Sequence, residues 1–165
     1  MKIMILSDSH SITKQTLLNF INQHPADYYI HCGDIYMPYS PLEIDNFYNV
    51  RGNNDFADIP KDLTLTIDGL NFFICHGHLF HIDESMYDLE QYALNHKIDV
   101  VCFGHSHNPT CYKKENTLFI NPGSVTFPRG NYPHPTYCIF DTENNEVQFY
   151  DLKENQPCNP FEVKK

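Results

Sequence analysis

The chain has 165 residues, of which 41% are hydrophobic and 19% are charged, and its formal net charge is −10. This composition is that of an ordinary globular domain and excludes a disordered chain. Lys and Arg contribute 11 residues against 21 Asp and Glu, which argues against a protein that coats nucleic acid, because phosphate backbones are bound mainly through cationic side chains. We expect a single domain over residues 1–165.

The sequence has no apolar run of the roughly 18 residues that a transmembrane helix needs, so we expect no membrane span. The apolar run at the N-terminus is too short for a signal peptide and is interrupted by Asp8 and His10, which favours a cytoplasmic protein. The six cysteines contain no C-x-x-C pair. They therefore predict free thiols rather than a disulfide scaffold or a structural zinc site.

The first third of the chain is predicted to alternate strands with helices. Short apolar runs that end in polar turns predict buried strands, and an apolar stripe at helical spacing that ends before Pro25 predicts an amphipathic helix. The elements expected here are a strand at 2–6, a helix at 11–23, a strand at 27–32, a loop at 36–41, a short helical stretch at 42–46 and a strand at 47–50.

Hairpins dominate the remainder of the chain. Asp68-Gly69 is a strong signal for a tight turn between two strands. The expected elements are strands at 63–67 and 70–75, a helix at 83–96, a strand at 98–103, a hairpin around 114–116, strands at 136–141 and 146–151, and a polar tail from about 152 that should fray. Parallel strand-helix-strand units mixed with hairpins predict an α/β protein with two packed sheets and helices outside.

Five apolar, strand-like runs are followed at once by side chains that can bind metal ions. These side chains are Asp8 and His10, Asp34, Asn53, His76, and His105 with His107. The first two and the last two are each separated by one residue, so in extended segments both members point to the same face. Gly104, just before the last pair, would allow the backbone to approach a neighbour closely.

These oxygen and imidazole ligands suit a pair of Mn, Fe, Zn or Ni ions, whereas a structural zinc site would show thiolates. The carboxylate of Asp34 has two oxygens that could bridge two ions. Two ions ~3.5–4 Å apart lower the pKa of a shared water and stabilise both the attacking and the leaving oxygen. The pattern therefore predicts a two-metal hydrolytic site.

The motifs D-x-H, G-D, G-N-x-D, H-G-H, G-H-x-H and N-P-G-S follow one another from Asp8 to about Arg129. Each motif is weak alone, but the complete ordered set is specific. It resembles the calcineurin-like metallophosphoesterase superfamily, and in detail its small YfcE-type phosphodiesterase branch. The resemblance implies a four-layer α/β/β/α sandwich of two mixed sheets, with a dinuclear site at the C-terminal ends of strands.

The resemblance also implies how the ligands divide between two ions. One ion would be held by Asp8, His10, Asp34 and His107, and the other by Asp34, Asn53, His76 and His105. Asp34 would bridge them. We expect two divalent ions, with manganese first and zinc, nickel or iron as alternatives. The expected catalytic residues are Asp34, Asn53, His76 and Asp55.

One position departs from the wider superfamily. Many larger members have a histidine directly after the ligand Asn, and it acts as the acid for the leaving group. This chain has Asn54 there, and the YfcE-type branch also lacks the histidine. Protonation would then fall to Asp55, to water, or to no residue if the leaving group is a good one. Alternatively, Asp55 orients His10 or another ligand.

Three residues are candidates for contact with the substrate: His78, Asn54 and Arg129. His78 could contact a phosphate or could be a polar loop residue. Arg129 could bind a phosphoryl oxygen, since arginine suits such recognition, or it could brace a loop through an ion pair. We favour a structural ion pair for Arg51. His31, inside a strand, is expected to be a core histidine with satisfied hydrogen bonds.

The expected function is a metal-dependent phosphoesterase, with a phosphodiesterase favoured, in which a metal-bridging hydroxide attacks phosphorus in line. One alternative is a non-catalytic protein-binding scaffold, because the fold resembles that of a retromer coat subunit. The other is a nuclease, against which the acidic composition and small size argue. The expected partner is a small phosphoester, without membrane or nucleic acid, and a homodimer is compatible with the exposed hairpins.

Overall fold

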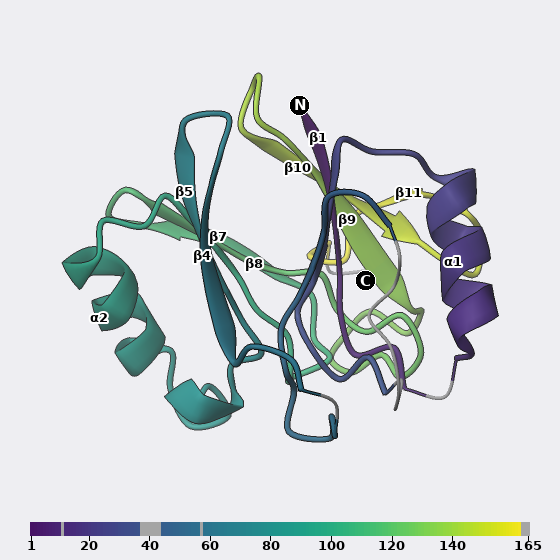
Figure 1. The fold of residues 1–165 in the computed structure, drawn as a ribbon, viewed down its shortest axis with the longest axis horizontal. Helices are drawn as coiled ribbons and strands as arrows, with labels where there is room; N and C mark the ends of the chain where they lie inside the picture. The colour runs from purple at the N-terminus through teal and green to yellow at the C-terminus, as the bar shows by residue number, and fades with distance from the viewer. Residues whose placement is uncertain (11, 37–43, 57, 163–165) are drawn as a thin grey trace.

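The computed structural model describes residues 1–10, 12–36, 44–56 and 58–162. Two sheets lie face to face, and one helix covers the outer face of each sheet (Figure 1). The layers therefore run helix, sheet, sheet, helix. This confirms the α/β/β/α sandwich of two mixed sheets that the sequence predicted.

The first sheet contains six strands in the order β11-β10-β9-β1-β2-β3. They are β1 (Lys2–Leu6), β2 (Tyr28–His31), β3 (Phe47–Asn49), β9 (Thr136–Asp141), β10 (Glu146–Asp151) and β11 (Gln156–Cys158). The strands β1, β2 and β3 are parallel, whereas β9 is antiparallel to both β1 and β10. Helix α1 (Lys14–Gln23) covers the outer face of this sheet, where its buried Leu17 and Ile21 share a core with Met4.

The second sheet contains five strands in the order β4-β5-β6-β8-β7. They are β4 (Asp62–Ile67), β5 (Leu70–Cys75), β6 (Val100–Cys102), β7 (Thr110–Lys114) and β8 (Thr117–Asn121). Helix α2 (Tyr87–Asn95) connects β5 to the parallel strand β6 and buries Leu89 and Ala93 against the outer face. A 3₁₀ turn, η1 (His78–Phe80), precedes it. Within the described ranges, no helix is long and apolar enough to cross a membrane.

The main core lies between the two sheets. Ile3 and Ile5 of β1 face Phe72 and Ile74 of β5 in this core, whereas Met4 belongs to the core under α1. Alternate residues of a strand point to opposite faces, and both faces of β1 are covered. This explains why β1 is a continuous apolar run rather than an alternating one. All six cysteines are free, as the sequence predicted.

Two helices are shorter than the sequence patterns indicated. The helix predicted from residue 11 begins at Lys14, because Thr13 caps it: the Thr13 hydroxyl accepts a hydrogen bond from the Thr16 N–H at 3.1 Å. The helix predicted from residue 83 begins at Tyr87. The predicted loop at 36–41 and helical stretch at 42–46 lie largely outside the described residues, and 44–46 form no helix.

The C-terminal tail corrects the expectation that residues from about 152 fray. Gln156–Cys158 forms β11, which pairs antiparallel with β10, and Cys158 lies opposite Phe149. This strand contains Pro157, which lacks a backbone N–H. Pro157 is tolerated because β11 is at the edge of the sheet, where one side of the strand needs no hydrogen-bond donor.

Candidate metal centre

The predicted ligands lie at the edge of the sandwich where the parallel strands end. Asp8 follows β1 and Asp34 follows β2, whereas His76 follows β5 and His107 lies in the loop after β6. Because β1 and β2 are parallel, as are β5 and β6, the carboxyl ends of each pair meet at one edge. In open α/β sheets this is the edge at which ligands bind.

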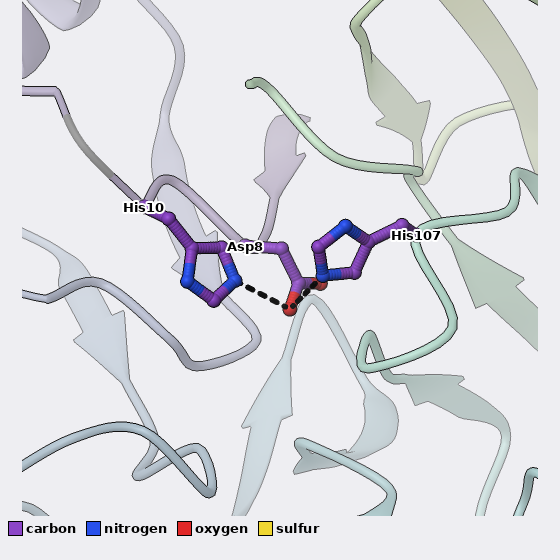
Figure 2. Close-up of side chains that lie close together, drawn as sticks. All are labelled: Asp8, His10 and His107. Atoms are coloured by element: carbon purple, nitrogen blue, oxygen red, sulfur yellow. Dashed lines mark ion pairs between the residues drawn. The ribbon is translucent and has the colours of Figure 1, made fainter. Parts of the chain in front are cut away.

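Five of the seven predicted ligands converge, and we call them the converging ligands: Asp8, His10, Asp34, His76 and His107. The Asp8 Oδ1 atom lies 3.3 Å from His107 Nε2 and 3.7 Å from His10 Nε2, and Figure 2 shows these two imidazoles on either side of the Asp8 carboxylate. Asp8 Oδ1 is also 3.7 Å from His76 Nε2. The Asp34 Oδ2 atom lies 3.3 Å from His10 Nε2 and 3.4 Å from His76 Nε2.

Two triads of ligand atoms lie close enough to hold a cation, each with its atoms within 4.8 Å of one another. They are Asp8 with His10 and His107, and Asp8 with Asp34 and His76. Asp8 belongs to both triads, whereas the resemblance had implied Asp34 as the bridging residue. The Asp34 carboxylate also reaches a histidine of each triad. Both carboxylates are therefore placed between the two candidate positions.

Two polar atoms at the centre support a metal ion. Asp8 Oδ1 and His10 Nε2 are buried and have no hydrogen-bond partner among the described residues. Leaving buried polar atoms unpaired is costly, and native structures rarely tolerate it without a reason. A divalent cation between the carboxylate and the imidazole would satisfy both atoms. Carboxylate oxygens together with imidazole nitrogens suit Mn, Fe, Zn or Ni, so the residues present fit the predicted ions.

The surroundings of Asp8 aim its Oδ1 atom into the centre. Its other oxygen, Oδ2, accepts hydrogen bonds from the Ser7 hydroxyl at 2.7 Å and from the His105 backbone N–H at 3.1 Å. The Ser124 hydroxyl donates to the backbone carbonyl of Asp8 at 2.7 Å. A Cβ on Gly104 would clash with the Ser7 hydroxyl and lie 2.7 Å from Asp8 Oδ2. Gly104 thus provides the close approach that the sequence predicted.

The surroundings of Asp34 change the expected roles of Asn54 and Asp55. Asn54 donates from its backbone N–H to Asp34 Oδ1 at 2.9 Å and from its side chain to Oδ2 at 3.0 Å, so it holds this carboxylate rather than standing free for substrate. The Asp55 carboxylate accepts three backbone N–H groups, from Asp34, Tyr36 and Gly52. This geometry fits an orienter of the Asp34 loop, not of His10, and does not fit an acid for the leaving group.

The carboxylates of the centre are held ionised by the imidazoles around them. Burial alone would raise the pKa of Asp8, but the neighbouring His10 and His107 hold it well below its usual range. Burial would likewise raise the pKa of Asp34, but His76 and Asn54 lower it to about 2. The Asp8 carboxylate in turn raises the pKa of His107. A cation that binds at the centre would therefore compete with a proton for the imidazole of His107.

The remaining two predicted ligands, which we call the outer ligands, do not belong to either triad. Asn53 is exposed, and its Oδ1 atom lies 3.0 Å from His76 Nε2. His105 lies beside the centre, with its ring 5.1 Å from that of His76, but its Nε2 atom is 2.7 Å from Asp83 Oδ2. Each outer ligand is thus engaged with another side chain.

Four predicted ligands share a rare backbone conformation. Their φ angles are 53° for Asp8, 56° for Asp34, 69° for His105 and 61° for His107. Left-handed φ is uncommon for residues other than glycine. Such conformations cost of order 1–3 kcal/mol each and cluster at functional sites, where the surrounding structure holds them.

The candidate substrate-contacting residues lie at different distances from the centre. The ring of His78 is 5.3 Å from that of His76, and its Nδ1 atom is buried without a hydrogen-bond partner in the part of the chain described. Arg129 is exposed, and its backbone N–H donates to the His107 carbonyl at 3.0 Å. No ion pair involves Arg129 or Arg51 among the described residues. The structural ion pair that we favoured for Arg51 is therefore not formed there.

Two residues that contact the predicted ligands were missed in the sequence. Asp83 is an exposed residue before α2, and nothing in the sequence around it distinguishes it from other surface carboxylates. Ser7 stands directly before Asp8, and this adjacency was its only signal. By contrast, His31 is the satisfied core histidine that was predicted, bonded to Ser9 and to the Gly33 N–H.

Known proteins resemble this chain over most of its length. The model of the calcineurin-like phosphoesterase superfamily domain matches residues 1–145. The protein named "Probable metallophosphoesterase YsnB" of Bacillus subtilis is 35% identical over 161 residues, which cover 94% of each chain. The protein named phosphodiesterase MJ0936 of Methanocaldococcus jannaschii is 30% identical over 169 residues, covering 90% of this chain and 97% of that protein.

Solved structures give the same result for the fold. A predicted phosphoesterase of Streptococcus pneumoniae superposes with a TM-score of 0.87 at 27% identity, covering 95% of this chain and 92% of that one. Vps29 of Entamoeba histolytica superposes with a TM-score of 0.77 and covers 96% of both chains, but at 18% identity it shows the fold alone. From the family model and the relatives that are 30% identical or more, we conclude that the chain belongs to the calcineurin-like phosphoesterase superfamily.

Proposed function

We propose that this protein is a phosphodiesterase that uses two divalent metal ions, with manganese as the first candidate. The observation that carries the proposal is the pair of buried, unpartnered atoms, Asp8 Oδ1 and His10 Nε2, at the meeting point of two ligand triads. Relatives support the reaction class, since they are named metallophosphoesterase and phosphodiesterase.

The two triads suggest which residues would hold each ion. Asp8, His10 and His107 would hold one ion, and Asp8, Asp34 and His76 the other. Asn53 and His105 would complete the ligands of this second ion. When bound, the ions would supply a water of lowered pKa as nucleophile and would neutralise charge on the phosphoryl oxygens.

The chain's own residues fix the arrangement. Asn54 holds both oxygens of Asp34 through two hydrogen bonds, and Asp55 holds the backbone N–H of Asp34. Neither of these residues is left to protonate a leaving group, because Asn54 does not titrate and Asp55 is occupied by three N–H donors. The geometry therefore favours esters with a good leaving group, which needs little help from an acid.

The test is hydrolysis of bis-p-nitrophenyl phosphate and p-nitrophenyl phosphate by protein stripped with a chelator and reloaded with Mn²⁺, Zn²⁺, Ni²⁺ or Fe²⁺. We expect the diester to be the better substrate. The Asp34→Asn variant should lose at least about 10³-fold in kcat/KM, or ~4 kcal/mol of transition-state stabilisation. Asp58→Asn, which changes an exposed carboxylate between β3 and β4, is the control and should retain activity.

The proposal would be overturned if no metal supported hydrolysis of either ester. The scaffold alternative would then be favoured, since one fold can serve unrelated functions. At present the residues argue for catalysis, because all seven predicted ligands are retained.

A further inference from the structure

A hollow of about 400 Å³ adjoins the metal centre. The residues that line it are Arg51, Gly52, Asn53, Lys61, His78 and Leu79. Asn53 is also one of the outer ligands, with its Oδ1 atom 3.0 Å from His76 Nε2. A substrate held at the centre therefore has an open space beside Asn53 into which one of its ester groups can extend.

The hollow is positively charged in an acidic protein. Arg51 and Lys61 contribute two cationic side chains, and its lining includes no carboxylate. The chain as a whole carries a net charge of −10 and has only two arginines. The lining of the hollow therefore has an excess of positive charge, whereas the chain as a whole has an excess of acidic residues. Such a surface attracts anions.

Neither cation is neutralised by the protein in the ranges that the structure describes. Lys2 and Lys114 form ion pairs with Asp141 and Glu90, but no ion pair involves Lys61. Arg51 donates from Nε to the Asp55 carbonyl at 3.3 Å, a bond that positions the guanidinium without cancelling its charge.

The backbone and His78 add two features of a binding site. The Arg51 N–H donates to the Pro60 carbonyl at 2.8 Å, so the strand end that carries Arg51 is joined to the segment that carries Lys61. His78, another lining residue, has an Nδ1 atom that is buried without a hydrogen-bond partner in the described chain. Leu79, about half exposed, supplies an apolar wall. The lining of the hollow thus combines two cations, a histidine with an unsatisfied nitrogen and one apolar side chain.

We propose that this hollow, the Arg51–Lys61 subsite, binds a negatively charged end of one ester group of the substrate. The preferred substrates are then phosphodiesters in which an ester group of roughly the size of a substituted phenyl ring ends in an anionic group such as a carboxylate. This inference rests on the proposed phosphodiesterase function and narrows it to a class of substrate.

The test uses two symmetrical diesters of similar shape, bis(4-carboxyphenyl) phosphate and bis(4-carbamoylphenyl) phosphate. Because both ester groups are the same, whichever one enters the hollow meets Arg51 and Lys61. The quantity compared is the ratio of kcat/KM for the carboxylate diester to that for the carboxamide diester. The two diesters differ in the reactivity of their leaving groups, but this difference is the same for every variant. It therefore cancels when the ratio is compared between variants.

We expect Lys61→Gln to lower this ratio about three- to fivefold, the size of one exposed charge pair. The loss should appear mainly in KM, because the interaction is equally present in ground and transition states. Arg51→Gln should lower the ratio further, and Arg51→Lys should restore part of it. Lys113→Gln removes the same charge from β7, outside the lining of the hollow, and should leave the ratio unchanged. The preference of the unaltered protein should shrink as salt is added.

The outcomes separate this inference from the proposed function. If the carboxamide diester is hydrolysed but Lys61→Gln and Arg51→Gln leave the ratio unchanged, the subsite is wrong and the phosphodiesterase stands. If bis-p-nitrophenyl phosphate and both diesters resist hydrolysis with every metal, the proposed function fails and the subsite falls with it.

Discussion

The converging ligands and the outer ligands differ in how the protein holds them. Asp8, Asp34 and His76 are almost completely buried, and Asp8 Oδ1 has no hydrogen-bond partner in the described chain. Asn53 is exposed, and His105 is bonded to Asp83, a carboxylate that is itself 65% exposed. One part of the centre is thus fixed by buried groups, whereas the other contains an exposed ligand, Asn53, and a contact of His105 that reaches solvent.

This difference indicates that the two metal positions are not equivalent. The ligand atoms of Asp8, His10 and His107 lie within 4.8 Å of one another, so binding of an ion there needs little rearrangement. Pre-organised ligands bind more tightly because less ordering is required. The position that depends on Asn53 and His105 requires these side chains to exchange partners or to tighten. We therefore expect one ion to bind tightly and the second more weakly.

The largest expected effect comes from Asp8, which belongs to both triads. Asp8→Asn should lower kcat/KM by at least about 10³-fold, or ~4 kcal/mol, because one negative charge shared by both ions is lost. Asn53→Ala, which removes only an outer ligand, should cost about 10- to 100-fold. Kinetics with bis-p-nitrophenyl phosphate and elemental analysis of bound metal would measure both effects.

The metal content of these two variants tests whether the converging ligands and the outer ligands bind metal as separate groups. Asp8→Asn should lose both ions, and Asn53→Ala should retain one. Equal losses of metal in the two variants would show that the converging and outer ligands form one cooperative site, and the distinction between them would then have to be abandoned.

The second-largest expected effect is a pH dependence of stability that arises from His31. This residue forms hydrogen bonds with both of the loops that carry Asp8 and Asp34. Its Nε2 atom is bonded to the Ser9 hydroxyl at 2.8 Å, and the Gly33 N–H donates to its Nδ1 atom at 3.1 Å. Since Nδ1 accepts a hydrogen bond, the ring is neutral in the folded protein. Complete burial, as the largest cause, lowers the pKa of His31 from its ordinary value of 6.5 to about 4.

The sign of the resulting pH dependence follows from this shift. Between pH 6.5 and pH 4 the unfolded chain binds a proton at His31 that the folded chain does not, so stability rises with pH in that range. Acidification through the range should cost about 3 kcal/mol of unfolding free energy from this residue. Asp8 and Asp34 lose their contributions only at lower pH, because their pKa values are lowered.

Urea denaturation of the metal-free protein at pH 7, 5 and 4 would measure the effect. His31→Gln should be less stable at pH 7, because two buried hydrogen bonds are disturbed, but should lose less stability on acidification. His96→Gln removes an exposed histidine at the end of α2 and should keep the full pH dependence. An unchanged acid dependence in His31→Gln would exclude His31 as its source.

Much of the fold could be predicted because the apolar runs were unambiguous. Ile3 and Ile5 face one core and Met4 another, and a run that is apolar on both faces indicates a covered strand. The prediction failed at β11, because a polar segment with Pro157 carries no such signal and pairs only through its backbone with β10. The start of α1 moved to Lys14 because a cap, not the apolar stripe, fixes where a helix begins.

At the candidate site, prediction from the sequence was limited in a different way. Ligands could be proposed because Asp and His followed strands, and parallel strands bring their ends together. The roles of the residues around these ligands could not be predicted, because each role depends on which atoms form hydrogen bonds in the folded protein. Asp55 and Asn54 stand beside Asn53 in the sequence, yet one holds a backbone and the other a carboxylate of Asp34. Asp83, which belongs to no motif, reaches His105 only through the turn before α2.

The smallest effect concerns Asp83 and the weaker metal position. Because His105 Nε2 is bonded to Asp83 Oδ2 at 2.7 Å, the Nδ1 atom of His105 is the nitrogen left to act as a ligand. Asp83→Asn keeps an acceptor but removes its charge, so it should weaken binding of the second ion about tenfold, or ~1.4 kcal/mol, and leave the first unchanged. The effect should diminish at high salt, since Asp83 is largely exposed.

Calorimetric titration of the metal-free protein with Mn²⁺ would resolve the two binding steps, and Glu84→Gln, a neighbouring exposed carboxylate, is the matched control. Tighter binding of the second ion in Asp83→Asn would mean that Asp83 competes with the metal for His105. An unchanged second step would mean that the pair has no role in binding. Only selective weakening of the second step supports Asp83 as the residue that orients His105, and it would also confirm that this outer ligand depends on a contact at the surface.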